Sequence, residues 1–274
     1  MSAAWRILNE DKTLLLLPIA SSVCLMLLTA IFLMPTIIAA VTGDSALDGL
    51  RQIEPLSQAG FFLSSVAIYS VGIFFNAALA ICVLRKLEGK PATILVGLKE
   101  ALSCLPHILG WAVVSATVGL LLRTIERRSG FLGGLVVSIV GLAWSVATFL
   151  VVPVLVAERK GPFEALQESV RILRRTWGEN LLAGIGFGGL YFLWSIPGAL
   201  AFVIGAGMTP SHLVIAIIIM ILAILYFPLL GLVLSTMSTI FDVVLYRYAK
   251  FGIVTLGFDH ALLESSFINK SVWT

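Results

Sequence analysis

The sequence is poor in charged residues. Asp, Glu, Lys and Arg make up 12% of its 274 residues, whereas a typical soluble domain carries about 25%. Hydrophobic residues account for 59% of the chain, and the mean hydropathy is +1.05. The segments between the apolar runs are too short for a soluble domain of about 100 residues. This composition excludes a soluble protein and indicates an all-α, polytopic membrane protein.

Cysteine and histidine are also scarce, with three of each. The cysteines are widely spaced in or beside apolar segments, which excludes a disulfide framework and a CxxC metal pair. No histidine pairs with Cys, Asp or Glu at metal-ligand spacing, and the HExxH, GxSxG and P-loop motifs are absent. We therefore predict no catalytic residue, metal or cofactor, and we expect the chain not to be an enzyme. The residues concerned are Cys24, Cys82, Cys104, His107, His212 and His260.

Long apolar runs dominate what is present. A span needs roughly 20 residues to cross the hydrocarbon core, and the chain contains six such runs. The first is too long for a cleaved signal peptide, so we interpret it as a span. We predict a transmembrane domain over residues 1–250 and a cytoplasmic tail over 251–274. The six spans are expected at about 13–40, 61–84, 105–123, 131–157, 181–206 and 212–241.

The distribution of Lys and Arg predicts the orientation. With these spans, one side of the membrane carries 14 Lys and Arg residues and the other carries 4. The positive-inside rule therefore places both termini in the cytoplasm, despite the outer group Arg123, Arg127 and Arg128. No dense basic block of the kind that binds nucleic acid occurs, so nucleic acid is excluded as a partner.

The connector over residues 162–177 has the pattern of an amphipathic helix. Its apolar residues follow a 3-4-3-4 spacing and form one stripe. Such a helix lies in the interface plane or packs on the inner face of the bundle. We predict this stripe as a surface for a partner or for the membrane interface. It consists of Phe163, Leu166, Val170, Leu173 and Trp177.

Similar connectors precede spans one, three and five, which predicts three tandem hairpins, each preceded by an interfacial helix. Asn76 near the end of span two parallels Asp242 near the end of span six. With Arg247, they form a candidate polar site, because polar residues inside a membrane are often functional. Two alternatives stay open: chance similarity between apolar segments, and simple hydrogen bonding between helices.

Span five begins with a glycine-rich segment in which Gly184 and Gly188 have GxxxG spacing. Small residues let helix backbones approach closely. We therefore predict helix packing through these glycines, either within the bundle or in a homo-oligomer.

Three segments carry a family resemblance: RILRRTWGENL (171–181), the end of span six (241–249) and the tail GFDHALLESSF (257–267). They resemble an uncharacterised prokaryotic family of six-span integral membrane proteins of unknown function. The tail segment KFGIVTLGFD is less polar than that resemblance leads us to expect. The resemblance implies a prokaryotic plasma-membrane location and a six-helix bundle, but no activity.

Two functions fit these features. The first hypothesis is a non-enzymatic scaffold or accessory subunit that binds membrane proteins or lipid. The second is a channel or transporter for a small solute, with a polar site near Asn76 and Asp242. Its partners are expected to be the lipid bilayer and either another membrane protein or a second copy of the chain.

Overall fold

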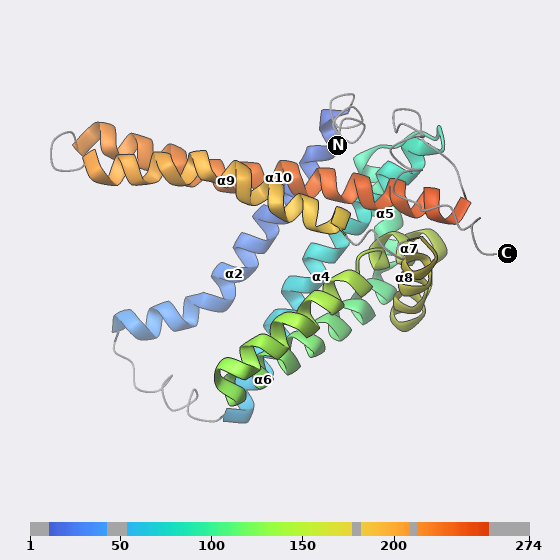
Figure 1. The fold of residues 1–274 in the computed structure, drawn as a ribbon, viewed down its shortest axis with the longest axis horizontal. Helices are drawn as coiled ribbons and strands as arrows, with labels where there is room; N and C mark the ends of the chain where they lie inside the picture. The colour runs from blue at the N-terminus through green and yellow to red at the C-terminus, as the bar shows by residue number, and fades with distance from the viewer. Residues whose placement is uncertain (1–10, 43–53, 177–181, 209–212, 252–274) are drawn as a thin grey trace.

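The computed structural model describes residues 11–42, 54–176, 182–208 and 213–251, and every element in these ranges is helical (Figure 1). Six of the helical segments are long and apolar enough to cross a membrane, which confirms the predicted number of spans. The elements are η1 (Lys12–Leu15), α2 (Leu16–Thr42), α4 (Glu54–Leu87), α5 (Ile94–Ser103), α6 (Leu105–Ala147), α7 (Val151–Glu158), α8 (Pro162–Thr176), α9 (Leu182–Met208) and α10 (Leu213–Phe251).

Helix α6 contains span three and the first part of span four, which continues through α7. The rings of Trp111 and Trp144 stack with centroids 5.8 Å apart and an interplanar angle of 17°. In a straight helix these residues would be about 50 Å apart, at 1.5 Å per residue. The chain therefore folds back between them, and its two arms lie side by side in Figure 1. The predicted turn between spans three and four falls within this fold-back.

The chain forms three hairpins: α2 with α4, the two arms of α6, and α9 with α10. The short helices η1, α5 and α8 precede them, as the connectors predicted. The helix boundaries lie near the predicted ones, except that α4 begins earlier, at Glu54, and α10 continues to Phe251. Helix α10 thus extends beyond the predicted end of span six, to the last described residue.

The buried core lies at one end of the hairpins. In α4, the run from Ala77 to Val83 is at most 4% exposed, and Ile108, Val154 and Val243 are fully buried around it. Alanines at positions 77, 78 and 80 let neighbouring helices approach this segment closely. The same end carries the short helices η1, α5, α7 and α8, which surround the core.

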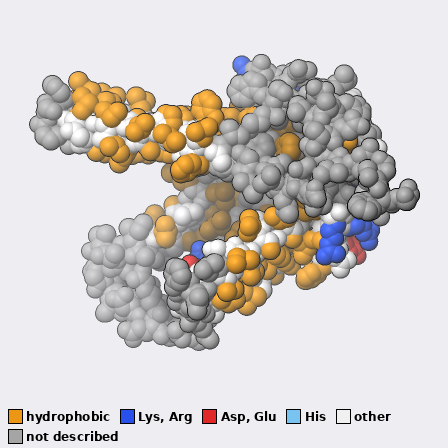
Figure 2. Space-filling view, viewed as in Figure 1, with side chains coloured by type: hydrophobic (Ala, Val, Ile, Leu, Met, Phe, Trp, Pro, Cys, Tyr) orange, Lys and Arg blue, Asp and Glu red, His pale blue; other side chains and the backbone are white. Residues whose placement is uncertain are grey.

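Away from this core the hairpins diverge (Figure 1). The α9/α10 hairpin extends in one direction, while α2, α4 and α6 extend in another. Figure 2 shows hydrophobic side chains along these arms, and charged side chains of both signs gathered near α8. The main contacts of the α9/α10 hairpin with α2, α4, α7 and α8 are made by α10.

Candidate functional site

Asn76, the predicted polar residue near the end of span two, contacts α10. The hydroxyl of Thr239 donates to Oδ1 of Asn76 at 3.3 Å, and it also bonds to the carbonyl oxygen of Ser235 in its own helix. Asp242 follows Thr239 by three residues, so both lie on one face of α10. Oδ1 of Asp242 is buried and accepts no hydrogen bond from the described residues. The structure thus joins Asn76 to α10 through Thr239.

Arg247, the third member of the predicted polar site, belongs to a different feature. It lines a cavity of about 480 Å³ at the end of the bundle. The walls of this cavity come from the ends of α4, α7 and α10, from α5, and from the turn that follows α4. The sequence-predicted set is therefore divided between an intramembrane contact and a cavity.

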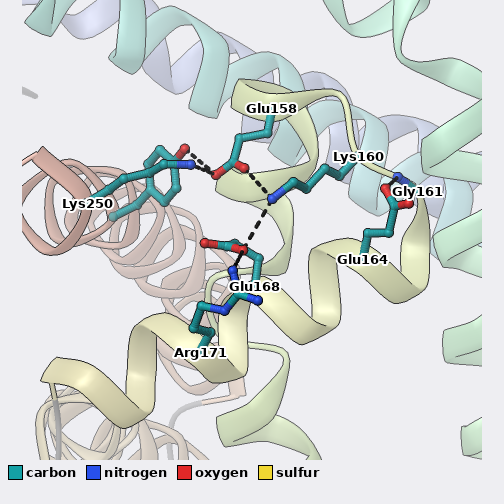
Figure 3. A network of polar contacts seen from close by, with 8 residues as sticks. Glu158, Lys160, Gly161, Glu164, Glu168, Arg171 and Lys250 are labelled. Carbon is teal, nitrogen blue, oxygen red and sulfur yellow. Dashed lines mark hydrogen bonds and ion pairs between the residues drawn. The ribbon is translucent and has the colours of Figure 1, made fainter.

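Glu158, the last residue of α7, lies at the centre of an ion-pair network (Figure 3). It accepts a hydrogen bond from the hydroxyl of Tyr246 at 2.8 Å and pairs with Lys250, both on α10. Its other carboxylate oxygen lies 2.7 Å from Nζ of Lys160. Only 13% of the Glu158 side chain is exposed, so these contacts are poorly screened by solvent.

Lys160 extends the network from α7 to α8. Its Nζ atom lies 3.2 Å from Oε2 of Glu168, which also pairs with Arg171 at 3.2 Å. The ion pairs with Glu158 and Glu168 raise the pKa of Lys160 above its ordinary value. The network therefore joins the ends of spans four and six to helix α8.

The turn between α7 and α8 brings these charges together. Arg159 adopts the left-handed conformation (φ 50°) that ends α7. The backbone amide of Gly161 then donates to the Glu164 carboxylate at 3.3 Å, which starts α8 at Pro162. The reversal is short, so α8 returns along α7.

Helix α8 is also held through a buried hydroxyl. Ser169 donates to the carbonyl oxygen of Ala147 at 2.7 Å and accepts from the amide of Leu150 at 3.2 Å. These two backbone groups flank the break between α6 and α7, where regular helical bonding is interrupted. Ser169 therefore satisfies polar groups that the break would leave unpaired.

The predicted apolar stripe of α8 is divided by this packing. Leu173 is buried, Leu166 and Val170 are half-buried, and Phe163 is 67% exposed. Trp177 lies outside the described residues. The structure therefore leaves Phe163 as the most accessible described member of the stripe.

The predicted packing glycines Gly184 and Gly188 lie within α9, in a part whose side-chain surroundings are outside the description. Close packing of α9 on α10 is seen further along. A Cβ at Gly198 would lie 2.6 Å from the ring of Tyr226, and one at Gly205 would lie 2.9 Å from Met220. Packing through Gly184 and Gly188 therefore stays a prediction, and the described contacts of α9 with α10 are at Gly198 and Gly205.

Sequence reasoning missed several residues of the network, namely Lys160, Tyr246 and Lys250. Two patterns could have pointed to them. Glu158 and Lys160 flank the end of span four, and Lys250 follows Tyr246 by one helical turn. The pairing between the two spans depends on their packing, which neither pattern reveals.

Comparison with known proteins gives a family but no function. No curated protein and no solved structure matches the chain. Residues 56–256, which hold spans two to six, match the family described as "Family of unknown function (DUF6159)". The chain therefore belongs to the DUF6159 family, whose function is unknown.

Proposed function

We propose that this membrane protein is a non-enzymatic scaffold or accessory subunit that binds a helix of another membrane protein. In this proposal it resides in a prokaryotic plasma membrane with both termini in the cytoplasm, as the Lys and Arg distribution favours. The charged network and the core hold the cytoplasmic ends of the hairpins together. The opposite ends of the hairpins diverge within the membrane, so their apolar faces are available to a partner.

The observation that carries the proposal is the isolation of helix α9. Its inner face packs on α10, where Gly198 and Gly205 allow close approach. Its opposite face is open: Leu193 is 60% exposed, Leu200 57% and Val203 66%. These residues follow a helical spacing and form a continuous apolar stripe. Another transmembrane helix can pack along such a stripe.

Co-purification tests the proposal. The chain is tagged, extracted from its native membrane in mild detergent, and its companions are quantified by mass spectrometry. Leu200→Ala, in the open stripe of α9, is compared with Met26→Ala, which truncates an apolar residue on α2 that is 75% exposed. We expect one stoichiometric partner that Met26→Ala retains and Leu200→Ala loses. Equal retention by both variants, or no partner with the unsubstituted chain, contradicts the proposal.

A second candidate function, a channel or transporter for a small solute, is favoured by Asp242. Its buried carboxylate oxygen lacks a hydrogen-bond partner among the described residues, and the Asn76–Thr239 contact lies one turn away. A buried unpaired polar atom is costly unless a proton, ion or solute satisfies it. Such a site suits a cation or a proton.

Reconstitution into liposomes distinguishes this candidate from the scaffold. Transport predicts flux of protons or K⁺ above that of empty liposomes and a strong reduction by Asp242→Asn. It also predicts that a cysteine introduced at Asn76 reacts with a polar thiol reagent. Absence of flux together with an unreactive cysteine removes the support for transport.

A further inference from the structure

The cavity that contains Arg247 lies where three spans end. The apolar segments Ala59–Leu87, Val136–Glu158 and Leu213–Phe251 all end at or beside residues that line it. Its volume of about 480 Å³ is within the range typical of small-ligand pockets, roughly 300–1,000 Å³. The cavity thus lies at the boundary between the hydrocarbon region and the Lys/Arg-rich side.

The charges that line the cavity leave one cation without an acidic partner. The lining contains four cations and three acids. Each acid pairs with one lining cation: Glu100 with Arg85, Glu88 with Lys90, and Glu158 with Lys250. The remaining cation, Arg247, is half-buried and has no ion-pair partner among the described residues.

Part of the cavity lining is apolar. Ile81 of α4 and Val156 of α7 are buried and line it, and Leu84 and Phe251 add further hydrophobic surface. The cavity therefore combines a guanidinium group with apolar residues of helices that continue into the spans. An anionic phosphate attached to acyl chains has the same arrangement of charge and apolar surface.

We propose that this cavity binds the phosphate group of an anionic phospholipid, with Arg247 as the main contact. The planar guanidinium can donate two parallel hydrogen bonds to phosphate oxygens, which makes Arg the preferred residue for this role. The acyl chains extend along α4 and α10 into the bilayer. This binding is independent of the scaffold function and of a partner on α9.

Native mass spectrometry of the full-length chain in detergent tests the proposal. Phosphatidylglycerol is added and compared with phosphatidylcholine of the same acyl chains. Arg247→Gln is compared with Arg174→Gln, which removes the same charge from the exposed surface of α8, outside the cavity. Arg247→Lys keeps the charge and serves as a second variant.

We expect the unsubstituted chain to retain phosphatidylglycerol in preference to phosphatidylcholine. Arg247→Gln weakens retention by at least about tenfold, the effect of losing a hydrogen bond between charged groups. Arg174→Gln stays within about twofold, and Arg247→Lys falls between the two glutamine variants. Equal weakening by both glutamine variants overturns the proposal, because it indicates diffuse surface charge.

A soluble phosphate is the other source of the same chemistry. Glycerol phosphate, which carries the phosphate group without acyl chains, is therefore tested at the same concentration as phosphatidylglycerol. Weak binding of glycerol phosphate beside strong binding of phosphatidylglycerol supports a lipid site. Binding of glycerol phosphate at least as strong as that of the lipid overturns the assignment to a membrane lipid.

Discussion

Replacing Gly97 by alanine should loosen helix α5 from α4. A Cβ at position 97 would meet Sγ of Cys82 and would lie 2.8 Å from the carbonyl oxygen of Ala78. Real Cβ atoms essentially never approach neighbours this closely, and a backbone oxygen inside a helix cannot move away easily. Overpacking of this kind costs about 1–3 kcal/mol. Alanine has a higher helix propensity than glycine by about 1 kcal/mol, which offsets part of the loss.

Gly72→Ala is the matched control. Gly72 is also helical, in α4, and a Cβ there would have no neighbour within 4 Å. The gain in helix propensity is common to both variants. The difference between their free energies of unfolding therefore gives the steric cost alone, about 1–3 kcal/mol. We expect Gly97→Ala to unfold several degrees below Gly72→Ala, since 1 kcal/mol corresponds to about 2–4 °C in a chain of roughly this size.

The assay is thermal unfolding of the purified protein in one detergent. The fraction that stays folded at each temperature is measured by size-exclusion chromatography. Adding Cys82→Ala to Gly97→Ala removes the sulfur but not the Ala78 oxygen, so partial recovery is expected. The reasoning is refuted if Gly97→Ala is as stable as Gly72→Ala.

Three further predictions concern the charged network and its supports, each measured by the same thermal assay. Ser169→Ala leaves two buried backbone groups unpaired and should lower the free energy of unfolding by about 1–3 kcal/mol. Its control, Ser138→Ala on an exposed helix face, should change that free energy by less than about 0.5 kcal/mol. Equal effects of the two variants contradict this account. Glu158→Gln removes the anion shared by two lysines and should cost about 1–3 kcal/mol, whereas no loss of stability would show that the network contributes little. The raised pKa of Lys160 implies stabilisation that is complete below its ordinary pKa of 10.5 and lost as the pH rises through the higher folded value; Lys160→Met should remove this part of the alkaline pH dependence.

The number of spans was predictable because hydropathy depends on local composition. Each apolar run is long enough to cross the membrane, and six helices of that character are found. The pairing of Asn76 with Thr239 was not predictable in this way, because the two residues are 163 positions apart. Their contact depends on how α4 and α10 pack, which no local pattern encodes.

Helix α8 shows a more specific limit. The spacing of large apolar residues predicts one contact face, whereas the residues closest to the bundle include the fully buried Ala165 and Ser169. Small side chains permit the closest approach of a helix to its neighbours, so the packed face is rotated from the apolar stripe toward them. In α9, close packing is described at glycines outside the predicted GxxxG segment, whose own packing stays a prediction. The contacts seen involve Gly198 and Gly205, opposite large residues of α10.

Site-specific photo-crosslinking in living cells tests the central claim most directly, namely that the open face of α9 binds a helix of another membrane protein. A photoreactive amino acid is placed at Leu200, and at Leu63 of α4 as an equally accessible control (57% and 65% exposed). The account predicts an adduct of one discrete mass from position 200, containing a single membrane protein, and none from position 63. Adducts of the same protein from both positions, or only lipid adducts from position 200, would contradict it.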